Sequence, residues 1–147
     1  MSVTIEVYHH TPQRLVDGSI DLDSDPIKVA LVDSNYVFDP TDTSYSDISA
    51  NEIAGGNGYA AGGAALANKA VTQSSGAMKW DADDVTWTNL TATFRRAILY
   101  VADGVNNYLL WSYLLDDTPA DITVTNTDYT LIVNAAGLLT GTISQAS

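Results

Sequence analysis

The sequence contains no cysteine among its 147 residues. Disulfide bonds, thiolate metal ligands and cysteine nucleophiles are therefore excluded. Basic residues are scarce as well, with 6 lysines and arginines against 18 aspartates and glutamates, which gives a formal net charge of −12. Nucleic acids and anionic membrane surfaces both bind proteins through clustered lysine and arginine. We therefore expect neither nucleic acid nor a membrane as a partner, whereas a basic partner fits the charge.

Long apolar runs are also missing. Residues 97–102 and 108–115 are apolar but much shorter than a bilayer-spanning helix, which needs about 20 residues. The first ten residues lack a basic segment followed by an apolar one, so we expect no secretory signal peptide. Hydrophobic residues make up 46% of the chain and charged residues 16%, a balance typical of a folded protein. The length predicts a single domain over residues 1–147.

Glycine is concentrated in residues 51–71, where the pairs Gly55-Gly56 and Gly62-Gly63 flank Gly58 and Tyr59. This density supplies turns with positive φ, allows close approach of two backbones and disfavours a stable helix. Its spacing does not match a dinucleotide-binding loop, and no helix is expected after it. We interpret the stretch as the crossing point of the fold.

The rest of the chain has the pattern of short β-strands. Alternating or continuous apolar residues predict strands at residues 3–7, 27–32, 64–72, 78–80, 85–88, 93–101, 108–115, 122–124, 129–133 and 138–143. Turn-forming residues separate them at fairly regular spacing, including 74–76, 102–107, 116–121 and 134–137. The pattern predicts an all-β fold, an antiparallel β-sandwich of jelly-roll or Greek-key type.

Two segments depart from this strand pattern. Residues 11–16 predict one short helical turn near the N-terminus, with Thr11 as N-cap, Pro12 in the first helical position and Gly18 as terminator. No second helix is expected. Residues 33–50 form a long polar loop, which is either functional or an interaction arm that lies along a partner and becomes ordered on docking.

Acidic clusters are the candidate metal and catalytic groups. Asp21, Asp23 and Asp25 alternate as at the start of a calcium loop, but Pro26 stands where that motif needs glycine and Val32 where it needs glutamate. A solvated aspartate-rich turn is the interpretation that we favour.

A second acidic cluster comprises Asp81, Asp83 and Asp84, which could pair as acid and base, with Trp80 and Trp87 as a platform for a sugar ring. Acidic turns between strands are common, however, and catalysis requires geometry before residue type. We therefore predict that the protein is not an enzyme and has no catalytic, metal-binding or cofactor-binding residues.

Two pairs of basic or titratable residues remain. His9-His10 lacks a carboxylate at metalloprotease spacing, and we expect one imidazole inward and one solvated. Arg95 and Arg96 are adjacent in a predicted strand, so one must turn toward the interior or a neighbour. The pair is either a guard of an edge strand or the site of an ion pair with an acidic turn of another subunit.

Five segments consist of turn and strand motifs rather than catalytic ones: residues 8–11, 23–31, 49–53, 58–66 and 81–87. In this order they resemble small structural proteins from the head-gene modules of tailed bacteriophages, a group that we associate with capsid decoration, or cement, proteins of jelly-roll type. The resemblance spans most of the chain to about Trp87 and, more loosely, the strands beyond.

The resemblance implies a mechanical function. A cement protein is made in the cytoplasm of the bacterial host, sits on the outer capsid surface of the virion and bridges major capsid protein subunits against the pressure of packaged DNA. It also implies self-association as a dimer or trimer. The alternatives are a tail or baseplate component, or a carbohydrate-binding module of a host-recognition structure.

Docking of this kind needs a set of interface side chains. We expect Trp80, Trp87, Trp111 and Tyr113 to pack in the core. The side chains expected at an interface are Tyr8, His9, His10, Tyr36, Phe38, Tyr45, Tyr59, Arg95 and Arg96.

Overall fold

The structure is a computed structural model that describes residues 3–116, 118, 120–133 and 139–142. Its strands are β1 (Thr4–Val7), β2 (Ile27–Val32), β3 (Ala64–Ala65), β4 (Ala70–Ser74), β5 (Ala77–Asp81), β6 (Val85–Phe94), β7 (Arg96–Val101), β8 (Leu109–Leu114), β9 (Ile122–Leu131) and β10 (Leu139–Thr142). Its helices are α1 (Thr11–Asp17), α2 (Tyr45–Ile48) and the 3-10 turn η1 (Ser49–Asn51).

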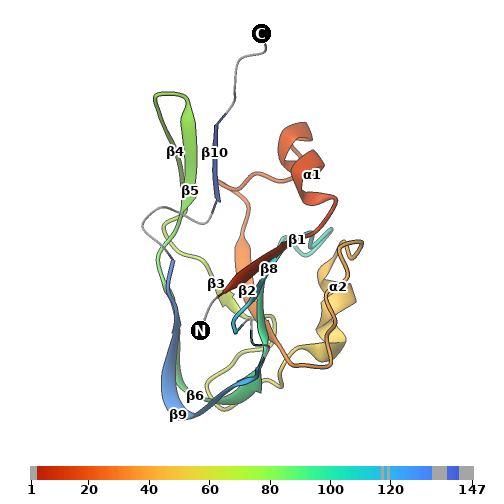
Figure 1. The fold of residues 1–147 in the computed structure, drawn as a ribbon, viewed down its shortest axis with the longest axis vertical. Helices are drawn as coiled ribbons and strands as arrows, with labels where there is room; N and C mark the ends of the chain where they lie inside the picture. The colour runs from red at the N-terminus through yellow and green to blue at the C-terminus, as the bar shows by residue number, and fades with distance from the viewer. Residues whose placement is uncertain (1–2, 117, 119, 134–138, 143–147) are drawn as a thin grey trace.

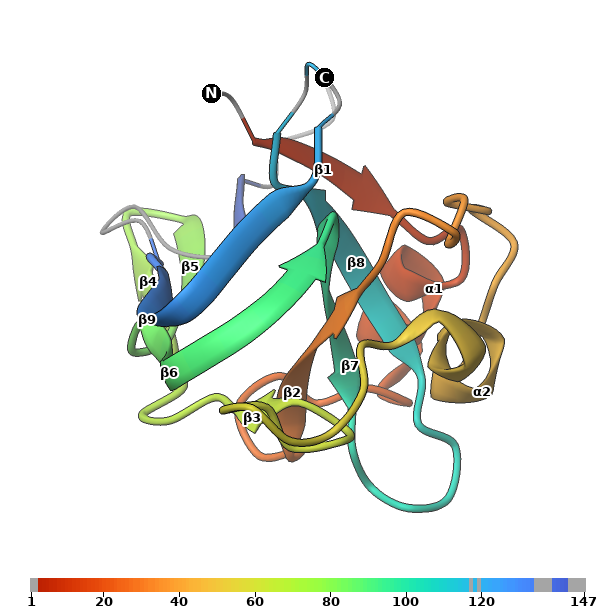
Figure 2. The same cartoon turned by 90° about the horizontal axis from the view of Figure 1, so that it is seen from below.

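Within this part of the chain the strands form three antiparallel sheets. One sheet has five strands in the order β1-β8-β7-β2-β3, the second has the order β10-β5-β4, and the third pairs β6 with β9. Figure 2 shows the five-stranded sheet in the middle, β6 and β9 on one side of it and α2 on the other. The predicted all-β, antiparallel fold of sandwich type is confirmed. Its finer assignment to a jelly roll or Greek key stays a prediction.

The core lies on both faces of the five-stranded sheet. In β2, Val29 and Leu31 pack into the cluster under β6 and β9, whereas Ala30 and Val32 pack into a second cluster on the opposite face. Strands buried on both faces read as continuous apolar runs rather than alternating ones. This explains why residues 27–32 are apolar at five of their six positions, and the predicted bounds of β2 are those observed.

The second core cluster is covered by the polar segment 33–50. Tyr36 and Ile48 from this segment are 4% and 0% exposed and pack against Ile98 and Tyr100 of β7. Ser44 and Asp47 form a capping box that starts α2. This segment therefore folds over its own sheet (Figure 1), so the alternative of an interaction arm that becomes ordered on docking is not supported. The expectation of a single helix was wrong, because α2 forms within the segment.

The predicted strand 93–101 is divided at Arg95, where the chain leaves the two-stranded sheet and enters the five-stranded one. The Arg95 amide donates to the Val32 carbonyl at 2.8 Å, and the Leu115 amide donates to the Arg95 carbonyl at 3.2 Å. The two predicted strands at 122–124 and 129–133 are instead one continuous strand, β9. The predicted tight link 134–137 lies outside the described residues.

The glycine stretch crosses between β2 and β6 at very short range. Gly63 has φ of +86°, and a Cβ there would lie 1.9 Å from the Val29 carbonyl oxygen. Gly58 has φ of +89°, and its Cβ would lie 2.6 Å from the Thr88 carbonyl oxygen. Both positions require glycine for conformation and for space, which confirms the prediction of close backbone approach in this stretch.

Helix α1 starts one residue earlier than predicted. His10 is its N-cap, and the Thr11 hydroxyl does not cap it but donates to the carbonyls of Leu109 and Leu110 at 3.2 and 2.8 Å. Gly18 ends the helix in the left-handed conformation, as predicted. None of the helices in the described residues has the length and apolar character needed to cross a membrane.

Candidate functional site

Strands β4, β5 and β10 form an arm that extends beyond the body of the molecule (Figure 1). All five residues of β4 are exposed, on both faces of the strand. A strand open on both faces gains little from the core of its own chain. The arm is anchored at its base by Trp80, which is 0% exposed, donates from Nε1 to the Leu22 carbonyl at 3.0 Å and packs edge-to-face on Trp111.

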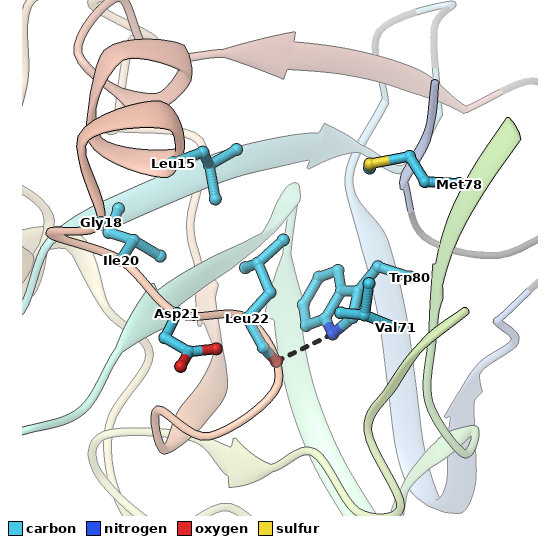
Figure 3. Close-up of a pocket in the computed structure, with 8 residues that line it drawn as sticks. All are labelled: Leu15, Gly18, Ile20, Asp21, Leu22, Val71, Met78 and Trp80. Carbon is cyan, nitrogen blue, oxygen red and sulfur yellow. Dashed lines mark hydrogen bonds between the residues drawn. The ribbon is translucent and has the colours of Figure 1, made fainter. Parts of the chain in front are cut away.

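An apolar groove of about 380 Å³ lies between this arm and α1. Its lining side chains come from α1, the turn after it and the arm: Leu15, Ile20, Asp21, Leu22, Val71, Met78 and Trp80, with Gly18. Figure 3 shows Leu15 and Met78 on opposite sides of the groove, with Trp80 and Leu22 between them. Val71 is 46% and Met78 37% exposed, so the arm presents apolar surface to the groove.

Carboxylates stand beside this apolar lining. Asp17 is the last residue of α1, and Asp21 and Asp23 lie in the turn that follows; all three are exposed, and Asp21 lines the groove. The Asp21 side chain accepts hydrogen bonds from the Ser24 hydroxyl at 2.7 Å and the Asp23 amide at 3.0 Å, and these bonds lower the pKa of its carboxyl. Asp21 is thus ionised at neutral pH, and the groove combines apolar walls with negative charge at its rim.

The aspartate-rich segment at residues 21–25 folds as a turn on its own backbone. The Asp25 side chain accepts from the Asp21 amide at 2.8 Å, which closes the turn together with the bonds to Asp21. Within the described part of the chain, no three His, Asp or Glu side chains are grouped so that they could hold a metal ion.

The alternative of a sugar platform at Trp80 and Trp87 is ruled out by their burial. Both indoles are buried, at 0% and 4% exposure, and neither offers a ring face to solvent. Trp87 packs against Tyr129 of β9. The sequence prediction that Trp80, Trp87, Trp111 and Tyr113 belong to the core is confirmed.

The acidic cluster at Asp81, Asp83 and Asp84 disperses in the fold. Asp81 pairs with Lys79 at 3.2 Å, Asp83 accepts from the Asn68 amide group at 2.5 Å, and Asp84 accepts from the Val133 backbone amide at 2.7 Å. Each carboxylate therefore has a different partner, and only those of Asp83 and Asp84 join separate segments of the chain.

His9 and His10 lie in the turn before α1, not in a strand. His9 is exposed, whereas His10 is partly buried and accepts from Arg14 Nε at 2.9 Å through Nδ1. Burial and the Arg14 charge lower the His10 pKa. The Arg14 guanidinium lies 3.8 Å from the centre of the Tyr108 ring, and the His10 ring packs edge-on against the same tyrosine at 5.7 Å, so both side chains hold the start of α1 against the residue that precedes β8.

Arg95 and Arg96 each form an ion pair within their own chain. Arg95 Nε lies 2.9 Å from Asp121, and Arg96 Nε lies 2.9 Å from Glu6 of the edge strand β1. Arg96 also donates to the Tyr36 carbonyl at 2.9 Å, which ties segment 33–50 to the sheet. Both arginines thus have acidic partners within this chain, so the alternative of an ion pair with another subunit is not needed to account for them.

Three of the predicted interface tyrosines are interior residues. Tyr8, Tyr36 and Tyr59 are 0%, 4% and 4% exposed, and burial raises the pKa of each. Their side chains are not available to a partner. Phe38 and Tyr45 are partly buried against the second core cluster.

A cluster of tyrosines around one glutamate, which the sequence did not predict, lies at the start of the glycine stretch. Glu52 accepts from the hydroxyls of Tyr45 and Tyr59 and from the Gly62 amide at 2.7 Å. Tyr100 stacks on Tyr45, with ring centres 4.7 Å apart, and burial raises its pKa to about 12. The only sign of this cluster in the sequence was that Tyr45 and Tyr59 lie close to Glu52 along the chain. Their contact, and that with Tyr100, depends on the fold.

Comparisons of the chain with protein-family models, with curated proteins and with solved structures found no match. The candidate site therefore rests on the geometry of the groove and arm.

Proposed function

We propose that this protein is a structural protein of a tailed bacteriophage virion, a decoration protein that binds the outside of the capsid and stabilises major capsid protein subunits. The observation that carries the proposal is the projecting arm beside an apolar groove with carboxylates at its rim. The five sequence segments between residues 8 and 87 that resemble phage head-module proteins also support a virion structural protein.

The groove suits an extended segment of the partner in which apolar side chains stand next to lysine or arginine. Apolar burial contributes about 25 cal/mol per Å², so filling the space between Leu15 and Met78 supplies affinity. The carboxylates of Asp17, Asp21 and Asp23, with the net charge of −12, favour basic partners and speed their encounter. A negative surface also suits a position outside the shell, away from packaged DNA.

The proposed mechanism is binding without a reaction. Polar side chains that could have carried chemistry are engaged in the fold: Asp83 with Asn68, Arg96 with Glu6, and Glu52 with two tyrosines. A cement protein works by adding contacts between neighbouring subunits, and its stabilisation follows the mass-action rule for any ligand that binds only the assembled state.

Binding to expanded shells tests the proposal. Purified protein is mixed with expanded shells of the phage that encodes it, the shells are sedimented, and bound copies are counted. We expect saturation at a fixed number of copies per capsomer, hundreds per particle. A protein that never sediments with the shells would refute the proposal, and a few dozen copies per particle would assign it to the tail or baseplate instead.

A matched pair of variants tests the groove itself. Met78→Asp places a charge in the groove wall, and we expect at least tenfold weaker shell binding, about 1.4 kcal/mol. Val105→Asp makes the same change at an 81% exposed position in the loop between β7 and β8, and binding should stay at the wild-type level. Circular dichroism checks that both variants are folded. Equal affinities for the two variants would contradict docking through the groove.

A further inference from the structure

Strand β1 is the free edge of the five-stranded sheet. Among the strands that the structure describes it pairs only with β8, and Figures 1 and 2 show it at the margin of the molecule. Val3, which directly precedes β1, and Ile5 and Val7 within it occupy alternate positions and are 55%, 55% and 46% exposed. Residues at alternate positions share one face of a strand, so the three form a continuous apolar stripe at the edge.

This edge is short and carries Glu6, but it lacks the other usual protections against pairing with another chain. Proteins blunt free edges with proline, lysine, bulges or very strong twist. Residues 3–7 contain neither proline nor lysine nor glycine, and the pairing of β1 with β8 runs without a shift from Thr4 to Val7. The unpaired backbone groups of β1 are therefore available in regular register.

The pattern of β1 is self-complementary. In an antiparallel pair of two β1 strands centred on Ile5, Ile5 faces Ile5 of the other copy and Val3 faces Val7. On the opposite face, Thr4 meets Glu6. Apolar and β-branched residues opposite one another stabilise antiparallel pairs by about 0.2–1 kcal/mol each. A sequence of this symmetry fits a second copy of itself better than an unrelated strand.

The distribution of charge also favours a second copy of this protein as the partner of β1. Two molecules of charge −12 repel over most of their surfaces. The single charge on β1 is Glu6, and its carboxylate is bound by Arg96 Nε at 2.9 Å and the Ser112 hydroxyl at 3.3 Å within the same chain. The β1 edge is thus a place where two copies can meet without opposing uncompensated carboxylates.

We propose that two copies of this protein associate through their β1 edges in an antiparallel, two-fold arrangement centred on Ile5, which joins their five-stranded sheets into one. The contact is isologous, and it therefore closes at two copies and gives a dimer rather than a trimer. An edge of about five residues is short compared with standard interfaces of about 800 Å² per partner. We therefore expect a dimer that dissociates on dilution through the micromolar range.

Sedimentation velocity over a range of protein concentrations measures this association. Ile5→Lys and Ile5→Glu each place like charges opposite one another at the two-fold axis, and each variant alone should dimerise at least tenfold more weakly than the wild type. An equimolar mixture of the two should regain dimers, because lysine then faces glutamate. Val105→Lys is the control for added charge and should dimerise like the wild type.

A cysteine variant tests the register directly. The chain has no cysteine, so Ile5→Cys introduces a single thiol at the proposed axis, and mild oxidation should link it into a covalent dimer. Val105→Cys at matched concentration should link much more slowly. A wild-type protein that stays monomeric at all concentrations, a trimer, or Ile5→Cys that links no faster than Val105→Cys would overturn the proposal. These results do not depend on shell binding, so the dimer and the decoration function can fail separately.

Discussion

Gly63 shows how tightly a single residue can constrain this fold. Its φ of +86° is unfavourable for other residues, and the Val29 carbonyl occupies the place of a side chain. Gly104 offers a comparison, because its φ is +76° but nothing lies within 4 Å of the place of its Cβ. The two positions separate conformational strain from steric conflict.

We predict that Gly63→Ala destabilises the protein by more than 3 kcal/mol, since the backbone of β2 or of the glycine stretch must move. Gly104→Ala should cost about 1 kcal/mol, because only the positive φ is unfavourable. Urea unfolding monitored by tryptophan fluorescence measures both. Equal losses at the two positions would show that the close approach to Val29 contributes nothing.

At this scale the sequence predicted some residues and missed others. Glycine density indicated close backbone approach, which Gly58 and Gly63 confirm. The burial of Trp80 and Trp87 was predicted as well, because large aromatic side chains usually pack in a core. The Glu52 cluster was missed because Tyr45 and Tyr100 come from segments far apart in the chain.

Among the elements, the arm and the central strands differ most in burial. Every residue of β4 is exposed, whereas β7 is buried at all positions except Arg96. Local opening needs little energy where few apolar contacts must be broken. The arm is therefore expected to be the least protected sheet and the five-stranded sheet the most protected.

We predict that amides of β4 exchange with deuterium at least a hundredfold faster than amides of β2 and β7. Hydrogen-exchange mass spectrometry on the free protein measures this difference. Segment 33–50 should show intermediate protection, because Tyr36 and Ile48 hold it on the sheet. Protection of β4 equal to that of β7 would contradict an arm that is open in the free protein.

Element boundaries were predictable where burial is uniform and less so where the chain changes sheets. The apolar run of β2 was found with its observed limits. The division at Arg95 was not, because it depends on which partner strand lies on each side. Helix α2 was missed because residues 33–50 are polar on average. The two buried residues of this segment, Tyr36 and Ile48, do not have the spacing of an amphipathic helix or strand.

For the molecule as a whole, regular turn spacing was enough to predict an antiparallel β fold. The sheet order β1-β8-β7-β2-β3 brings together strands from both ends of the chain, and such long-range pairing leaves no local mark. The site had the same limit: its walls, α1 and the arm, are separated by more than fifty residues, so only the fold brings Leu15 and Met78 to one groove.

The acidic side chains make stability depend on pH in a defined direction. The Asp103 side chain accepts hydrogen bonds from the backbone amides of Val105, Asn106 and Asn107, which lower the pKa of its carboxyl in the folded state. A carboxyl with a lowered pKa adds stability above its unfolded value of about 3.9 and loses it as pH falls further. Asp103→Asn removes this dependence and keeps a side-chain acceptor.

We predict that the wild type unfolds at a higher temperature than Asp103→Asn at pH 7, and that the difference shrinks toward zero below about pH 3. Differential scanning calorimetry between pH 2 and pH 7 measures it. The general change in net charge is shared by both proteins, so the difference isolates one carboxyl. If the difference in unfolding temperature between the two proteins were constant with pH, the ionised Asp103 carboxylate would add nothing to the stability of the folded state.

The central claim is that the groove beside the arm docks on a capsid subunit. A cryo-electron density map of phage particles carrying this protein tests it most directly. We predict density for this chain on the outer capsid surface, with Leu15, Val71 and Met78 covered by a segment of the major capsid protein. Density only in the tail, or a decorated capsid on which the groove faces open solvent, would contradict it.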